Sequence, residues 1–110
     1  MAKMSREKGK RGEREFAAYL REHGYAAKRG VQYQGGQDSP DVVGLPGVHI
    51  EVKRTEQLRL YDWLDQARDD AGPQIPLIAH RKNGKGWVAI MPMDDFMRLY
   101  ELAHDKMEER

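Results

Sequence analysis

Cysteine is absent from this chain of 110 residues, and long apolar runs are absent too. Without cysteine there is no disulfide, no thiolate zinc site and no cysteine nucleophile. No apolar stretch approaches the roughly 18 residues of a membrane span. The polar stretch over residues 1–15 lacks the apolar segment of a secretory signal. We therefore expect one cytoplasmic domain over residues 1–110, from a bacterial, archaeal or phage-infected cell.

Charge is abundant, at 34% of the residues, but it is unevenly distributed. Residues 1–30 carry nine basic side chains against four acidic ones, whereas residues 94–110 carry three against six. Arg81, Lys82 and Lys85 form a second basic cluster. This polarity predicts a basic face suited to phosphate groups, although an ordinary solvated surface explains the charges equally well.

The hydrophobic spacing predicts eight elements in the order α-β-β-β-α-β-β-α. The helices are expected over residues 5–23, 58–71 and from 92 onward, and the strands over residues 25–28, 41–45, 49–54, 75–80 and 86–91. Residues 30–39, rich in glycine and glutamine, predict a mobile loop. This order indicates an α/β fold with a mixed central sheet flanked by helices.

The segment over residues 49–53 alternates strictly between polar and apolar side chains. Because successive side chains of a strand point to opposite faces, Ile50 and Val52 are expected in the core. His49, Glu51 and Lys53 then share the other face. Taken alone, a glutamate and a lysine in this arrangement indicate only an exposed ion pair on a half-buried strand.

Asp41 adds a second carboxylate to this face. It follows Pro40 and opens the apolar pair Val42-Val43, so it lies at the start of the preceding strand. A turn at Pro46-Gly47 would bring the carboxylates of Asp41 and Glu51 together across a hairpin. Two close carboxylates repel each other unless a cation lies between them, which predicts Mg²⁺ or Mn²⁺. The alternative for Asp41 is a turn-forming residue that uses its side chain locally.

Glu13 lies on the apolar stripe of the first helix, four residues before Ala17 and in line with Leu20. An acidic side chain there must reach solvent, pair with a cation or bind a metal. A frayed and solvated helix end is the alternative. Gly9, one turn earlier, would let another backbone or a substrate approach closely.

Two groups of residues resemble a known family. Ser39-Pro40-Asp41 followed by Ile50-Glu51-Val52-Lys53 resembles the PD-(D/E)xK nuclease signature. The preceding residues Lys8-Gly9, Glu13-Arg14-Glu15, Gly24-Tyr25-Ala26 and Arg29 resemble those of archaeal Holliday junction resolvases and their phage relatives. The resemblance implies a restriction-endonuclease-like αβββαβ core and an endonuclease that acts on branched DNA such as Holliday junctions.

The same resemblance implies the roles of individual residues. Glu13, Asp41, Glu51 and Lys53 would be catalytic, and Arg14 and Arg29 would support DNA or transition-state binding. The cofactor would be Mg²⁺, with Mn²⁺ as a substitute, held by Asp41, Glu51, the backbone carbonyl of Val52 and, through water, Glu13. Cleavage would leave a 5′-phosphate. The residues expected to contact DNA are Lys8, Lys10, Arg11, Arg14, Arg29, Arg81 and Lys82.

Other residues are weaker candidates. Gln66, which falls off the core stripe of its helix, could lie near a metal, and His49 shares the active face although an exposed strand histidine is the usual reading of such a position. Gln32, Tyr33, Gln34 and Gln37 of the predicted loop could contact DNA, or the loop could be a plain connector.

The resemblance also implies a homodimer, because a four-way junction needs two symmetric cuts. Residues 75–79 and the last helix, with Phe96, Leu99, Tyr100, Ala103 and Met107 on one face, offer surface for it; otherwise both complete one small core. Two alternative functions stay open. One is a nicking, flap or restriction-like nuclease of a phage or mobile element, and the other is an inactive DNA-binding module of the same fold.

Overall fold

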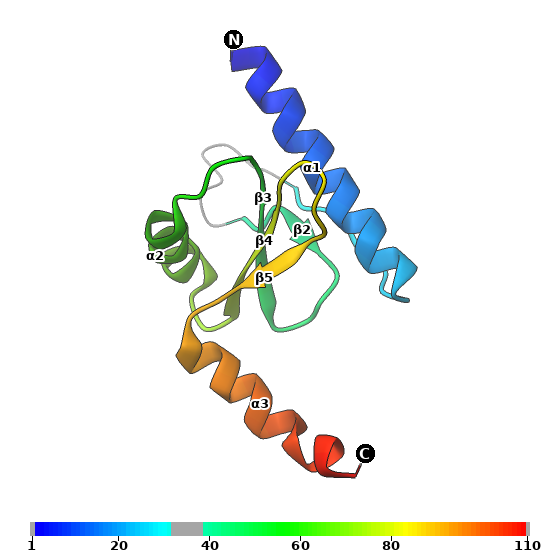
Figure 1. Ribbon diagram of the computed structural model, residues 1–110, viewed down its shortest axis with the longest axis vertical. Coiled ribbons are helices and arrows are strands. Elements are labelled where there is room, and N and C mark those ends of the chain that lie inside the picture. The colour runs from blue at the N-terminus through cyan, green and yellow to red at the C-terminus, as the bar shows by residue number, and fades with distance from the viewer. Residues whose placement is uncertain (1, 32–38, 110) are drawn as a thin grey trace.

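A computed structural model describes residues 2–31 and 39–109, with side chains from residue 7 onward. The elements follow in the order α1 (Ala2–Glu22), β1 (Lys28–Arg29), β2 (Val42–Val43), β3 (Val48–Arg54), α2 (Leu60–Ala71), β4 (Ile75–Arg81), β5 (Val88–Ile90) and α3 (Met93–Glu108) (Figure 1). The predicted order is confirmed. The four loop residues named as DNA contacts, Gln32, Tyr33, Gln34 and Gln37, lie outside the described residues.

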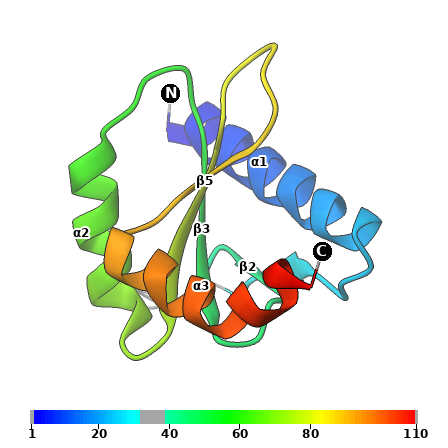
Figure 2. The ribbon, with the colours of Figure 1, turned by 60° about the horizontal axis from the view of Figure 1, so that its bottom comes forward.

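The described strands form one five-stranded sheet in the spatial order β1-β2-β3-β4-β5. β3 and β4 run parallel over seven residue pairs, and the other neighbouring pairs run antiparallel. The sheet is therefore mixed, as predicted. α1 and α2 cover its two faces, which are best separated when the sheet is seen from its end (Figure 2). This layering separates the side chains of β3 into one set under α1 and one set under α2.

The main core lies between α1 and the sheet. Phe16, Ala17 and Leu20 of α1 pack with Val42 and Ile50. Such burial supplies roughly 1.5–3 kcal/mol for each large apolar side chain. Leu77 and Ala79 of β4 belong to the same cluster, and Trp87 packs edge-on against Phe16 with ring centroids 4.9 Å apart.

The α2 face of the sheet is covered through small side chains. Ala67 and Ala71 are buried there, and their size lets the helix lie close over the strands. Residues 75–80 of β4 are all buried, which confirms that this strand belongs to the core rather than to a free surface.

Element ends differ from the predictions where backbone turns intervene. β1 begins at Lys28 instead of residue 25. Gly24 has a φ of 92°, and its amide and that of Tyr25 bond back to the carbonyls of Arg21 and Leu20. These bonds end the helix in a turn that occupies residues 23–25, so extended pairing starts later.

A close approach between α1 and β3 occurs at Gly12, not at Gly9. A Cβ atom added to Gly12 would lie 2.7 Å from the Cβ atom of Arg54, whereas Gly9 has open space around it. Among the described residues no other segment approaches Gly9, and the close approach within the chain is at Gly12 instead. The helix crosses the strand three residues later, where glycine permits the contact.

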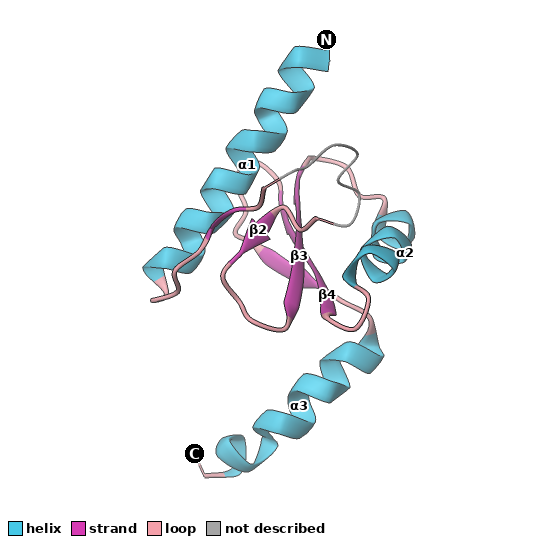
Figure 3. Ribbon diagram, turned by 180° about the vertical axis from the view of Figure 1, so that it is seen from behind, coloured by secondary structure: helices cyan, strands magenta, loops and turns pink. Residues whose placement is uncertain are grey.

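α3 extends away from the layered body (Figure 3). None of its residues is buried, and its apolar face is formed as predicted but left open, with Phe96 and Tyr100 both more than 40% exposed. The alternative that this helix completes the core is therefore wrong. None of the described helices is both long and apolar enough to cross a membrane.

Candidate active site

The two carboxylates of the predicted motif lie across the β2–β3 pair. Val42 pairs with Ile50 in antiparallel register, so Asp41 lies opposite Glu51. The Asp41 amide donates to the carbonyl of Ile50 at 2.8 Å, and its Oδ2 atom accepts the amide of Val52 at 2.8 Å. Asp41 therefore uses its side chain across the hairpin, unlike the local turn residue of the alternative reading.

The Glu51 side chain is 12% exposed, which places a carboxyl in a poorly solvated site. Burial, the charge of Asp41 and a hydrogen bond to the Asp41 side chain together raise the pKa of Glu51 to about 9. Lys53 lowers the pKa of Glu51, while Asp70 raises it. Carboxyls that hold protons this tightly are frequent where a cation normally compensates the negative charge.

His49 lies buried on this face and is only 1% exposed. Its Nε2 atom lies 3.1 Å from Oε1 of Glu51 in a hydrogen bond. The expectation of an exposed strand histidine is wrong, since α2 covers the face of β3 that carries His49, Glu51 and Lys53.

Asp70, in the last turn of α2, is a site residue that the sequence reading missed. One ligand atom each from His49, Glu51 and Asp70 lies within 4.8 Å of the others. The signal was available in the sequence, because Asp70 follows Ala67 by three residues and so lies on the apolar stripe of its helix. The same reasoning that drew attention to Glu13 applies to Asp70.

Glu13 reaches the site from α1, with a side chain 15% exposed. Its Oε1 atom accepts a hydrogen bond from Nε of Arg29 at 3.0 Å. Burial and the charge of Asp41 raise the pKa of Glu13, and Arg29 lowers it. Glu13 is therefore held in place near Asp41, so the alternative of a frayed and solvated helix end is wrong.

Lys53 completes the arrangement on the α2 face. Its Nζ atom lies 5.7 Å from the ring centroid of Trp63, which attracts a cation to its π face. Across the parallel register Lys53 pairs with His80, whose ring lies 5.6 Å from that of Trp63. The amine of Lys53, the carboxyls of Asp41, Glu51 and Asp70, and the imidazoles of His49 and His80 therefore lie on the side of the sheet that α2 covers.

Comparisons with known proteins give a family match and a structural match. The family model described as archaeal Holliday junction resolvase matches residues 4–109. The chain belongs to the archaeal Holliday junction resolvase family. It is similar to the solved structure of Archaeoglobus fulgidus Hjc, a Holliday junction resolvase from an archaeal hyperthermophile. That match has 27% identity and a TM-score of 0.58, and it covers 76% of this chain and 72% of the other. No curated protein matches the chain.

Membership of this resolvase family makes the protein a nuclease that acts on branched DNA. The predicted resemblance and the restriction-endonuclease-like α/β fold are both confirmed by the family match and the structural match. The DNA-binding module without activity is not what this family indicates.

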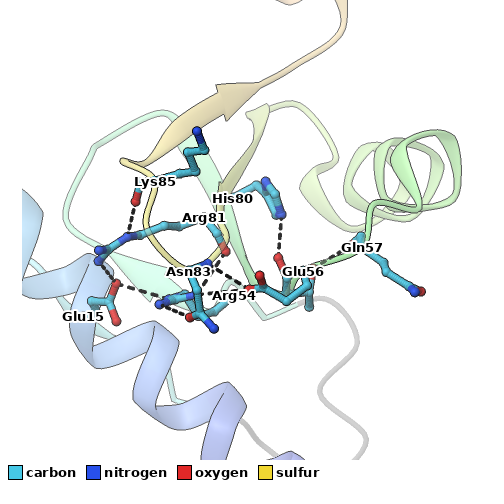
Figure 4. Close-up of polar contacts among 9 residues, drawn as sticks. Glu15, Arg54, Glu56, Gln57, His80, Arg81, Asn83 and Lys85 are labelled. Carbon is cyan, nitrogen blue, oxygen red and sulfur yellow. Dashed lines mark hydrogen bonds and ion pairs between the residues drawn. The ribbon is translucent and has the colours of Figure 1, made fainter.

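The resolvase-family chain also carries an ion-pair network beside the candidate site (Figure 4). Arg54 and Arg81 both pair with Glu15 of α1. Arg54 also donates from Nη2 to Oδ1 of Asn83 at 3.0 Å, and the Asn83 amide donates to Glu56. The network ties α1 to the ends of β3 and β4. It was not predicted, because its partners are up to 66 residues apart in the sequence.

A pocket of about 410 Å³ lies next to this network. His80, Arg81, Lys82, Lys85 and Trp87 are among the residues that line it. Arg81 and Lys82 are two of the predicted DNA contacts, and they bring positive charge to a surface that includes an aromatic ring.

The remaining predicted residues lie on α1, β1 and α2. Lys8, Lys10, Arg11 and Arg14 are exposed on α1, and Arg29 is half-buried beside Glu13. Gln66 is exposed on α2 and stays a weak candidate.

Proposed function

We propose that this protein is a divalent-metal-dependent endonuclease that hydrolyses phosphodiester bonds in branched DNA. Asp41, Glu51 and Lys53 would form its active site. Glu13 would be the fourth catalytic residue. The observation that carries the proposal is the meeting of Asp41 and Glu51 across the β2–β3 pair, with Lys53 two residues further on the same face. Carboxylates alone would repel an anionic phosphate, so this arrangement needs a cation to bind the substrate.

The donor set fits Mg²⁺, with Mn²⁺ as a substitute. Oxygen ligands suit both ions. Burial and, after it, the charge of Asp41 raise the pKa of Glu51 to about 9, so a cation at this site would stabilise the ionised carboxylate. Asp41 and Glu51 would hold the ion, with the Val52 carbonyl as the further ligand that the family resemblance implies and Glu13 acting through water. When bound, such an ion lowers the pKa of water and neutralises charge developing on the phosphate.

The protein's own groups have separate tasks in the proposed reaction. The Val52 amide fixes Asp41, so that carboxylate is positioned before substrate arrives. Lys53 would stabilise negative charge on the phosphate and orient the attacking water, and Trp63 holds its amine nearby. Arg29 neutralises and orients Glu13. Departure of the 3′ oxygen would leave a 5′-phosphate on the product.

DNA would follow the exposed basic residues of α1 and the cluster at Arg81 and Lys82. Cations on such a surface bind the phosphate backbone without reading sequence.

Two symmetric cuts in a junction would come from a homodimer. The open apolar face of α3 is the surface we assign to this dimer, because its exposed aromatic and methionine side chains match the composition of protein interfaces. Met93, Phe96, Met97 and Tyr100 are exposed on this helix.

A cleavage panel tests the proposed function. The substrates are a four-way junction, a flap, a linear duplex and a single strand, each with Mg²⁺, Mn²⁺ or EDTA. We expect metal-dependent cleavage of the branched substrates and 5′-phosphate ends. Lys53→Ala should reduce the cleavage rate by roughly 10²–10³ while junction binding in a mobility-shift assay is retained.

Lys106→Ala is the matched control, since Lys106 is a highly exposed lysine on α3. Its cleavage rate should equal that of the unmodified protein. Undiminished cleavage by Lys53→Ala, or full cleavage in EDTA, would contradict the assignment.

A further inference from the structure

Three side chains that can bind a metal lie together where α2 covers β3. His49 and Glu51 come from β3, and Asp70 comes from α2 on the layer above. One ligand atom of each lies within 4.8 Å of the others, so a single ion could contact all three. Glu51 is hydrogen-bonded to the side chains of Asp41 and His49, and its ligand atom lies close to that of Asp70.

Asp70, one of the three residues, has an unsatisfied side-chain oxygen. Its Oδ2 atom is buried and has no hydrogen-bond partner among the described residues. A buried polar atom without a partner costs free energy, and the cost is larger for a charged group. Asp70 also lies in the last turn of α2, where the negative end of the helix dipole disfavours an acidic side chain. A bound cation would satisfy the oxygen and offset both penalties.

The ligand chemistry narrows the kind of cation. His49 is buried and offers an imidazole nitrogen, which Mg²⁺ accepts poorly and first-row transition metals accept well. Two carboxylates with one imidazole suit Mn²⁺ or a later metal of that row.

We propose that His49, Glu51 and Asp70 form a second cation site that selects a first-row transition metal such as Mn²⁺ over Mg²⁺. The site rests on the proposed function only through Glu51, which it shares with the Asp41 site. A bound ion there would lie beside the first and would hold α2 against β3. Without a metal, a protonated imidazole between the two carboxylates is the competing arrangement of the same side chains.

Mn²⁺ binding to the full-length, metal-stripped protein without DNA tests the second site. Calorimetry gives the stoichiometry, and pulsed electron paramagnetic resonance detects an imidazole nitrogen bound to Mn²⁺. We expect two ions per chain, one with nitrogen coupling, and we expect excess Mg²⁺ to displace only the other. Asp70→Asn should weaken the nitrogen-coupled site by at least 10-fold.

Asp69→Asn is the matched control, because Asp69 is the exposed neighbour of Asp70. It should leave both sites unchanged, whereas His49→Gln should remove the nitrogen coupling. Circular dichroism checks that each variant is folded. If Asp70→Asn or His49→Gln unfolds, the stoichiometry and nitrogen coupling of Mn²⁺ in the unmodified protein decide whether the second site exists. One ion per chain without nitrogen coupling, or equal binding by Asp70→Asn and Asp69→Asn, would overturn the second site.

Asp41→Asn separates this result from the proposed function. In one outcome, the unmodified protein binds a single Mn²⁺ ion without nitrogen coupling, and Asp41→Asn loses both that ion and cleavage. This pair of results leaves the nuclease proposal standing and overturns the second site. A chain that binds no Mn²⁺ and cleaves equally well in EDTA overturns both.

Discussion

Gly12→Ala is expected to destabilise the protein although it places a better helix former in a helix. In an open helix position, alanine stabilises by roughly 1 kcal/mol relative to glycine. At Gly12 the new Cβ atom would lie 2.7 Å from Cβ and 3.3 Å from Cγ of Arg54. Those atoms cannot easily move, because the guanidinium is held by Glu15 and Asn83. Overpacking of this kind costs roughly 1–3 kcal/mol, which exceeds or cancels the gain.

Gly9→Ala gives the comparison, because no atom of the described residues lies within 4 Å of a Cβ atom added there. The two variants carry the same chemical change in the same helix, so their difference isolates the steric cost. At about 4 °C per kcal/mol for a domain of this size, Gly12→Ala should melt about 4–12 °C below Gly9→Ala. Urea unfolding with EDTA present measures the same difference as a free energy.

Activity provides a second measurement on the same pair. Glu13 follows Gly12 directly, so a displaced α1 would move the Glu13 carboxylate relative to Asp41, and cleavage by Gly12→Ala should fall. If Gly12→Ala is as stable as Gly9→Ala, the contact between α1 and β3 is not as close as described, and the reasoning fails.

Three further predictions concern charge and assembly. In EDTA, the free energy of unfolding should fall as pH rises from about 4.5 to about 9, because the folded state holds the Glu51 proton that the unfolded chain has lost. Glutamine has no such proton to lose, so the stability of Glu51→Gln relative to the unmodified protein should grow with pH. A stability difference between the two proteins that does not change with pH would contradict this. Tyr100→Glu, on the open face of α3, should give a monomer in light scattering and impair paired cuts, whereas a persistent dimer would exclude that face. Lys82→Ala should weaken junction binding and reduce the slope of log binding constant against log salt concentration by about 1, the value for one lost phosphate contact. An unchanged slope would exclude a phosphate contact at Lys82.

The sequence predicted the parts of the site that depend on a short stretch of backbone. Alternation along β3 placed Glu51 and Lys53 on one face, and a turn at residues 46–47 brought Asp41 opposite Glu51. The 3.6-residue period of α1 likewise placed Glu13 toward the sheet. Local periodicity determines such positions before any tertiary contact forms.

The parts that were missed depend on how separate elements pack. Asp70 could be placed on the stripe of α2, but its meeting with His49 depends on which turn of that helix lies over β3. The burial of His49 depends on the same packing. Glu15, Arg54 and Arg81 meet only after α1 has docked on the sheet, so no local pattern predicts their network.

The double pairing of β3 has a consequence for how this chain can change in length during evolution. β3 pairs with β2 on one side and with β4 over seven residues on the other, and its successive side chains serve opposite layers. Deleting one residue within the strand would exchange Lys53 and Arg54 between those layers. The reactive amine and the contact with Gly12 would be lost together. Changes in length are therefore confined to the segments between strands, and β3 itself can vary only by substitution.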